Sequence, residues 1–164
     1  MQVTRISMLI SVIFISGFYL TCFAQLNNSE IKYLSESADI IVAGKVIQQS
    51  SNWNENQTRI YTRATIQVEE YLKGNNNGNS VIVTYPGGEV GEVGEMYSHT
   101  PRFENNEDVL VFLKNDEKST GYKVLNGEQG KISIIIDSKT GEQISNSNIK
   151  INSLKEQIKN YIND

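Results

Sequence analysis

The sequence predicts a mainly β protein: a small five-stranded barrel of the OB type with a short helix near each end of the chain. Two observations support this fold class. Short apolar runs rich in β-branched residues follow one another at close spacing, while helical periodicity occurs only near the ends. In addition, Gly44 interrupts the first run and a wide insert separates the third run from the fourth, which favours a curved sheet that closes on itself.

The first 24 residues have the pattern of a secretory signal peptide. Arg5 places a positive charge ahead of the apolar run Ile6–Leu20, and small residues stand one and three positions before Gln25. We therefore expect cleavage after Ala24 and an exported protein, either secreted or periplasmic.

Two other fates of this segment are disfavoured. An uncleaved membrane anchor would need about 20 apolar residues, and the run has only about 15. Lipid attachment at Cys22 is disfavoured by Tyr19 and Thr21, which stand where lipoprotein signals usually have leucine and a small residue.

Residues 25–164 then form a single domain by length. Removing Arg5 from the 15 basic residues leaves 14 against 19 acidic ones, a net charge of −5. Such a chain, without any basic run, is a poor candidate for nucleic acid, and after signal removal we expect no membrane association. The one cysteine, Cys22, leaves with the signal, so core packing must hold the domain together without disulfides.

The N-terminal half of the domain is predicted to contain one helix and three strands. Ser29 can cap a helix that ends near Asp39. Gly44 indicates a bend or bulge in the first strand, and the second strand alternates between a buried and a wet face. The predicted strands cover residues 40–47, 59–69 and 81–85. Polar loops and turns are predicted at residues 50–58, 70–74 and 75–79.

The C-terminal half is predicted to contain further strands and a final helix. The strands cover residues 109–113, 122–125 and 131–136, with a short run at 142–144. Asn126 and Gly127 between two of these runs are typical of a β-hairpin. Ser153 and Glu156 form a capping box for a helix over residues 153–163. The core is expected to contain Ile41, Val46, Ile66, Val68, Val81, Val83, Val109, Val111, Phe112, Ile132 and Ile134.

Six segments together resemble a pattern in exported bacterial domains of unassigned role. They are residues 38–46, 68–74, 86–88, 101–103, 109–113 and 129–131. This pattern is similar to the netrin-like OB-barrel domain of the tissue inhibitors of metalloproteinases, and it covers about residues 34–136. The resemblance implies a netrin-like barrel and suggests a protease as one class of partner. Shared folds carry many unrelated activities, so the resemblance is weakly specific for function.

The chain departs from those inhibitors at its N-terminus. The animal inhibitors are stapled by disulfides and present an N-terminal cysteine to the protease zinc, whereas cleavage after Ala24 would leave Gln25 first and no cysteine. An N-terminal glutamine tends to cyclise, which removes the amine that would bind the metal. Any protease binding is therefore expected to use the loops, particularly residues 87–103.

The insert of residues 86–103 is the candidate functional region. It contains both prolines, many glycines and the only histidine of the chain. The candidate partner-binding residues are Trp53, Gly87, Gly88, Glu89, Glu92, Tyr97, His99 and Arg102. Because residues 87–100 are polar and longer than a typical connection, we expect them to be mobile until a partner binds. Phe103 is expected to plug the end of the barrel.

Metal binding and serine catalysis by the insert are less favoured than partner binding. A zinc site would normally need two or three histidines or cysteines, so no metal or cofactor is predicted at His99. Glu89, Glu92 and Glu95 recur every three residues and could gather around Ca²⁺, but a solvated loop fits better because calcium loops contain more Asp and Asn. No nucleophile-elbow glycines surround Ser98, the sequence neighbour of His99.

The sequence thus favours an exported, non-catalytic binding module that engages a protein partner, with a protease as one option, through its loops. The alternative is a hydrolase with a site around His99 and the 86–103 insert. Substituting His99→Ala and assaying hydrolase substrates would separate the two.

Overall fold

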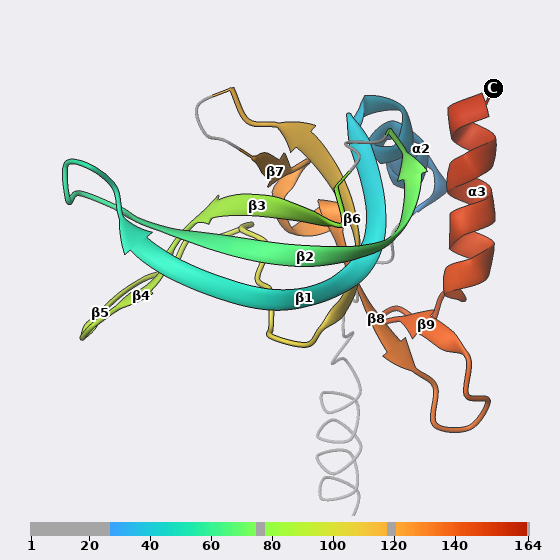
Figure 1. Cartoon of the computed structure of the whole chain (residues 1–164). Coiled ribbons are helices and arrows are strands. Elements are labelled where there is room, and N and C mark those ends of the chain that lie inside the picture. The colour runs from blue at the N-terminus through green and yellow to red at the C-terminus, as the bar shows by residue number, and fades with distance from the viewer. Residues whose placement is uncertain (1–26, 75–77, 118–120, 164) are drawn as a thin grey trace, which may run out of the picture.

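Five strands close into a barrel in the structure, a computed structural model that describes residues 27–74, 78–117 and 121–163 (Figure 1). In order around the barrel these are β1 (Ile40–Trp53), β2 (Ile60–Lys73), β3 (Ser80–Pro86), β7 (Tyr122–Val124) and β6 (Asp108–Asn115). Pairing of β1 with β6 closes the ring, and β3 with β7 is its parallel pair. The predicted OB-like barrel is confirmed, whereas the predicted signal peptide lies outside the described residues.

The first strand bends because of its glycine. The pairing of β1 with β2 shifts register between Ala43 and Gly44 and again between Val46 and Gln48. A Cβ atom at Gly44 would overlap the carbonyl oxygen of Gln67 on β2, so only glycine allows the two backbones to approach this closely. The predicted bend at Gly44 is confirmed.

The first two strands extend beyond their apolar patterns. Residues 50–53, predicted as loop, belong to β1, and residues 70–73, predicted as turn, belong to β2. Polar side chains do not end these strands, because each backbone group still pairs with the opposite strand, as Trp53 does with Ile60. The result is a long curved hairpin that reaches well past the barrel (Figure 1).

The apolar residues form two clusters, one on each face of the barrel wall. One fills the barrel and contains Ile40, Val42, Val46, Ala64, Ile66, Val81, Val83, Tyr85, Phe103, Val109, Val111, Leu113 and Val124. The other lies under the helices and contains Ile31, Leu34, Ala38, Ile41, Leu110, Phe112, Ile132, Ile151, Leu154 and Ile158. Every predicted core residue belongs to or packs against one of these clusters, although Val68 and Ile134 are only partly buried.

Both helices begin earlier than the sequence indicated. The helix α2 (Asn28–Ser37) is capped by Asn27, whose side chain accepts from the Glu30 amide, while Ser29 lies inside the first turn. A capping oxygen must precede the first free amides, and Asn27 is the residue in that position. The helix α3 (Ile151–Asn163) starts two residues before Ser153, so the predicted capping box is also wrong.

The helices pack beside each other against one side of the barrel (Figure 1). Lys155 and Lys159 of α3 bind the Glu70 carboxylate of β2 at 2.9 and 2.8 Å.

Among the described residues, no helix is long and apolar enough to cross a membrane.

The predicted hairpin at Asn126 and Gly127 is wrong. Strands β7 and β8 (Lys131–Ile136) do not pair with each other; each pairs with a different part of β6. Asn126 and Gly127 do adopt the left-handed conformation that a tight hairpin needs, with φ of 56° and 60°. The 3-10 turn η1 (Gly127–Gly130) then carries the chain along β6 instead of back on itself, and β8 pairs with β9 (Gln143–Ser145).

Candidate functional site

The insert after β3 folds into a hairpin of its own. Strand β4 (Gly88–Val90) pairs with β5 (Val93–Glu95), and the chain then returns across the end of the barrel to Phe103. This hairpin projects from the end of the barrel away from the helices (Figure 1). Within the stretch of residues 87–100, which the sequence predicted to be mobile, residues 88–90 and 93–95 form a two-stranded sheet.

Three hydrogen bonds hold the root of the hairpin on the start of β2. The Gly87 amide donates to the Ile60 carbonyl at 2.8 Å, and the Thr62 hydroxyl donates to the Gly87 carbonyl at 2.6 Å. The Ile60 amide donates in turn to Oε2 of Glu95 at 3.0 Å. Glu95 therefore binds the Ile60 amide beyond the register at which β3 pairs with β2.

The backbone at the start of the insert requires glycine at two consecutive positions. Gly87 and Gly88 have φ of 97° and 125°, which side chains with a Cβ rarely adopt. A Cβ at Gly88 would also overlap the hydroxyls of Ser51 and Thr62, which bond to each other at 2.8 Å. The hairpin can therefore lie directly on this pair.

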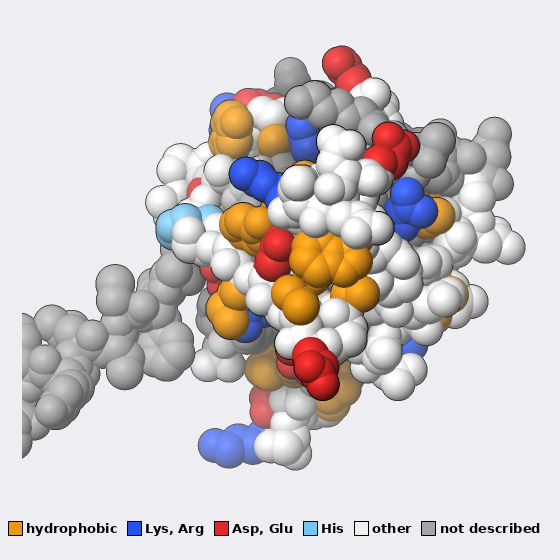
Figure 2. Space-filling view, turned by 90° about the vertical axis from the view of Figure 1, so that its left-hand side faces the viewer, with side chains coloured by type: hydrophobic (Ala, Val, Ile, Leu, Met, Phe, Trp, Pro, Cys, Tyr) orange, Lys and Arg blue, Asp and Glu red, His pale blue; other side chains and the backbone are white. Residues whose placement is uncertain are grey.

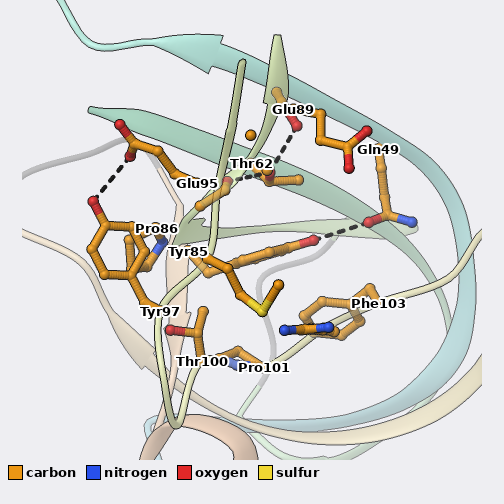
Figure 3. A pocket seen from close by; sticks show the side chains of 16 residues that line it. Gln49, Thr62, Tyr85, Pro86, Glu89, Glu95, Tyr97, Thr100, Pro101 and Phe103 are labelled. Atoms are coloured by element: carbon orange, nitrogen blue, oxygen red, sulfur yellow. Dashed lines mark hydrogen bonds between the residues drawn. The ribbon is translucent and has the colours of Figure 1, made fainter. Parts of the chain in front are cut away.

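Between the hairpin, the barrel end and the returning chain lies a cavity of about 580 Å³, here called the mouth pocket (Figure 3). Its lining residues are Gln49, Ser51, Thr62, Tyr85, Pro86, Gly87, Gly88, Glu89, Gly94, Glu95, Met96, Tyr97, Thr100, Pro101, Arg102 and Phe103. In Figure 3, Thr62 and Glu89 lie on one side and Pro101 and Phe103 on the other, with Tyr85 between them. The volume is in the range of small-molecule and side-chain binding sites.

The floor of the mouth pocket is aromatic. The rings of Tyr85 and Phe103 lie 5.6 Å apart and tilted, and both belong to the barrel cluster. Phe103 is buried at the barrel end, in the position expected of a plug. The Tyr85 hydroxyl donates to Oε1 of Gln49 at 2.9 Å, and burial raises the pKa of that hydroxyl. Tyr85 therefore stays neutral under ordinary conditions.

Tyr97 on the returning chain forms part of the pocket wall. Its hydroxyl donates to Oε2 of Glu95 at 2.9 Å, and this bond raises the pKa of Tyr97. The Arg59 guanidinium carbon lies 6.0 Å from the centre of the Tyr97 ring. Glu95 thus fastens the returning chain as well as the hairpin.

A second pocket of about 680 Å³ lies on the other side of residues 96–102. Its lining residues are Met96, Tyr97, Ser98, His99, Thr100, Arg102, Glu104, Glu107, Glu128, Lys131, Ser133 and Asn146. At its base, Lys131 and the Ser133 hydroxyl both donate to Oε1 of Glu107 at 2.6 Å, and the Glu104 amide donates to Oε2 at 3.0 Å. Because these polar groups, of which Lys131, Ser133 and Glu107 are partly buried, satisfy one another, they serve the fold, and the mouth pocket is the better candidate site although it is smaller.

The structure brings together some of the predicted site residues. Gly87, Gly88, Glu89, Tyr97 and Arg102 all line the mouth pocket. His99 lines only the second pocket. Neither Trp53 nor Glu92 lines either pocket. Trp53 is half-buried at the end of β1, and Glu92 lies in the exposed turn between β4 and β5.

Two charged side chains at the mouth pocket are unpaired. Within the described ranges, neither Glu89 nor Arg102 makes a hydrogen bond or an ion pair, and both are exposed. Met96, which lines the same pocket, is 75% exposed. Figure 2, which faces this end of the molecule, shows apolar side chains gathered there with carboxylates beside them. The rim therefore combines unpartnered charge with apolar surface.

The insert carboxylates do not converge on a cation site. In the part of the chain that the structure describes, there is no group of three metal-ligating His, Cys, Asp or Glu side chains. Glu95 binds the Ile60 amide and Tyr97, while Glu92 lies in the hairpin turn.

His99 is positioned by its backbone at the second pocket. It is exposed, has a φ of 59°, and is held by its own carbonyl, which accepts from the Glu128 amide at 3.0 Å. Among the described residues, the imidazole makes no hydrogen bond to a hydroxyl or carboxylate. The Ser98 hydroxyl likewise makes no hydrogen bond to a described residue.

Sequence reasoning missed several residues that form the mouth pocket. Thr62 gave a signal, because it is a polar residue on the inward face of an otherwise apolar strand. Glu95 was seen only as one of three spaced glutamates. Gln49 and Met96 gave no signal, since their role depends on segments that are distant in sequence.

Comparison of the chain with protein-family models and with curated proteins gives no match.

Proposed function

We propose that the protein is an exported, non-catalytic binding module that engages a protein partner through the mouth pocket. The observation that carries this proposal is the lining of the pocket, which includes the exposed Met96 and the unpaired charges of Glu89 and Arg102. Methionine, aromatic residues and arginine are enriched at protein interfaces, where a partner removes them from water.

The way in which the insert is held supports the same conclusion. Glu95 and Thr62 fix the root of the hairpin, and the Glu128 amide fixes the returning chain at His99. A pocket held in place before binding loses less conformational entropy when the partner arrives. The mouth pocket is therefore suited to binding.

Export rests on the sequence pattern of residues 1–24. Mass spectrometry of the protein isolated from the cell exterior or periplasm should find Gln25, free or cyclised, as the first residue. A mature terminus at Cys22 would instead indicate a lipoprotein and contradict this part of the proposal.

A protease is the partner class that the resemblance to netrin-like domains implies. If a protease is the partner, inhibition should depend on the mouth pocket and not on the first residues of the mature chain. Inhibition of a zinc metalloprotease that disappears when two or three N-terminal residues are deleted would contradict this arrangement.

The partner itself can be sought with two matched variants. Immobilised wild-type protein, Met96→Ala and Ile136→Ala would be incubated with the exported proteins of the source organism. Ile136 is a suitable control because it is 60% exposed but lies on β8, away from the mouth pocket. We expect a specific partner that wild type and Ile136→Ala retain and that Met96→Ala loses. Equal capture by both variants would contradict the proposal.

A further inference from the structure

We propose that the mouth pocket receives a basic side chain, lysine or arginine, of the partner, with Glu89 as its counterion. This inference rests on the proposed function and specifies the chemistry of the partner. It follows from the unpaired carboxylate, the distribution of hydrogen-bond donors and acceptors, and the aromatic lining.

The position of Glu89 allows its carboxylate to meet a partner. Glu89 lies on β4 directly opposite Gly94 of β5, and its Cγ is 3.5 Å from where a Cβ of residue 94 would stand. Because Gly94 has no side chain, the stem of Glu89 has room across the hairpin. The carboxylate lines the pocket and makes no bond to any described residue.

Several side-chain donors of the pocket are engaged, although the Arg102 guanidinium is not. The Thr62 hydroxyl donates to the Gly87 carbonyl, and the Tyr85 hydroxyl donates to Gln49. The Gln49 amide nitrogen donates to Oδ1 of Asn105 at 3.4 Å. A ligand that offers further donors, as lysine and arginine do, would find in Glu89 an acceptor with both oxygens open.

Two rings around the pocket already accept cations of the protein itself. Nζ of Lys131 lies 5.2 Å from the centre of the Phe103 ring, and the guanidinium carbon of Arg59 lies 6.0 Å from that of Tyr97. Aromatic faces attract ammonium and guanidinium groups, and the aliphatic stem of either side chain can pack on Tyr85 and Met96. The lining therefore suits both the charged head and the apolar stem of a basic residue.

Arg102 in the lining opposes a cation, as do the charges of Lys131 and Arg59 at the neighbouring rings. Arg102 also lines the second pocket, whose lining includes Glu104 and Glu128. The chain as a whole has a net charge of −4, which attracts a cationic segment and repels an acidic one.

The inference can be tested with small probes in a titration followed by NMR. The probes are Nα-acetyl-lysine methylamide and its arginine equivalent, with Nα-acetyl-norleucine methylamide as the uncharged control. The charged probes should shift the amide signals of Gly88 and Gly94, which line the pocket, and the norleucine probe should bind more weakly. The affinity should also fall as salt is added, because the ion pair is partly exposed.

Three variants separate the charge of Glu89 from other effects. Glu89→Gln should weaken binding of the lysine probe about fivefold, the size expected for a lost partly exposed ion pair. Glu92→Gln makes the same change on the same hairpin outside the pocket and should bind like wild type. Arg102→Gln should bind equally well or more tightly. Unchanged signals outside the pocket would show that each variant is folded.

Several outcomes would overturn the inference. Equal binding of the norleucine and lysine probes would mean that the pocket recognises only the apolar part of the side chain. Binding of Nα-acetyl-glutamate methylamide that requires Arg102 would assign the pocket to an anion. A concentration-dependent dimer in sedimentation, abolished by Glu89→Gln, would assign it to a second copy of the chain.

Capture of the partner distinguishes this inference from the proposed function. If Met96→Ala loses the partner while Glu89→Gln retains it fully, the proposed function stands and the inference fails. If the lysine probe binds at the pocket but Met96→Ala captures the partner normally, the pocket chemistry stands and the proposed function fails.

Discussion

The helix-covered side of the barrel and its open end are built on different principles. Under the helices, Ile41, Leu110 and Phe112 are completely buried, although they point away from the barrel interior. At the open end, the insert is held by side-chain hydrogen bonds from Glu95 and Thr62 and leaves apolar atoms exposed. Stability therefore resides mainly on the helix-covered side, and we propose that binding takes place at the open end.

The two kinds of contact differ in energy. Burying a large apolar side chain contributes about 1.5–3 kcal/mol, whereas a typical hydrogen bond contributes a net of about 0.5–1.5 kcal/mol. Changes at the open end should therefore alter recognition before they alter folding, and changes under the helices should do the reverse.

The largest expected effect is that of removing a buried ring under the helices. Phe112→Ala should lower the free energy of unfolding by about 3–5 kcal/mol, because it leaves a cavity between β6 and the helices. Val93→Ala, on the exposed hairpin, should change it by less than about 0.5 kcal/mol. Urea unfolding measures both values, and similar losses in the two variants would remove the basis of the comparison.

A smaller effect is expected from a methyl group at the root of the hairpin. In Gly88→Ala the added Cβ would collide with Ser51 and Thr62 at an unfavourable φ, at a cost of about 1–3 kcal/mol. The hairpin should shift, so that Glu95 releases the Ile60 amide and its hydrogen exchange accelerates. Gly94→Ala is the control, because its Cβ meets nothing closer than 3.5 Å. Unchanged exchange at Ile60 in Gly88→Ala would show that the hairpin does not depend on this contact.

The smallest expected effect concerns the ion pairs that attach α3. Hydrogen bonds from Lys159 and Lys155 lower the pKa of Glu70, so its contribution to stability is present above the ordinary carboxyl pKa and is lost as the pH falls through the lowered value. Because Glu70 is partly exposed, Glu70→Gln should cost less than about 1 kcal/mol at pH 7 and nothing in strong acid.

The neighbouring Glu69, exposed and without an ion pair among the described residues, provides the control for that measurement. Glu69→Gln should leave urea unfolding unchanged at every pH. A loss in Glu70→Gln that persists unchanged in strong acid would mean that charge is not the cause.

The sequence was sufficient for the fold where side-chain patterns decide the structure. The alternation along β2 identified its buried face, and Gly44 marked the bend in β1. It was insufficient where backbone pairing or distant contacts decide. Trp53 remains in a strand because Ile60 pairs with it, and Asn27 rather than Ser29 caps α2.

The candidate site was predictable only in part for the same reason. Gly87, Gly88 and Glu89 were identified because the insert itself is conspicuous in the sequence. Thr62 and Tyr85 belong to strands whose inward residues meet the insert only after the barrel closes. The role of Glu95 depends on an amide 35 positions earlier, a contact that no local pattern indicates.

Site-specific photo-crosslinking tests the central claim, that the partner binds at the open end. A photoreactive amino acid would replace Val93 on the hairpin or Ile135 on β8, two positions with nearly equal exposure, 47% and 48%, at different ends of the molecule. After irradiation with the exported proteins of the source organism, position 93 should yield a crosslinked partner and position 135 should not. A partner crosslinked only from position 135 would contradict the account.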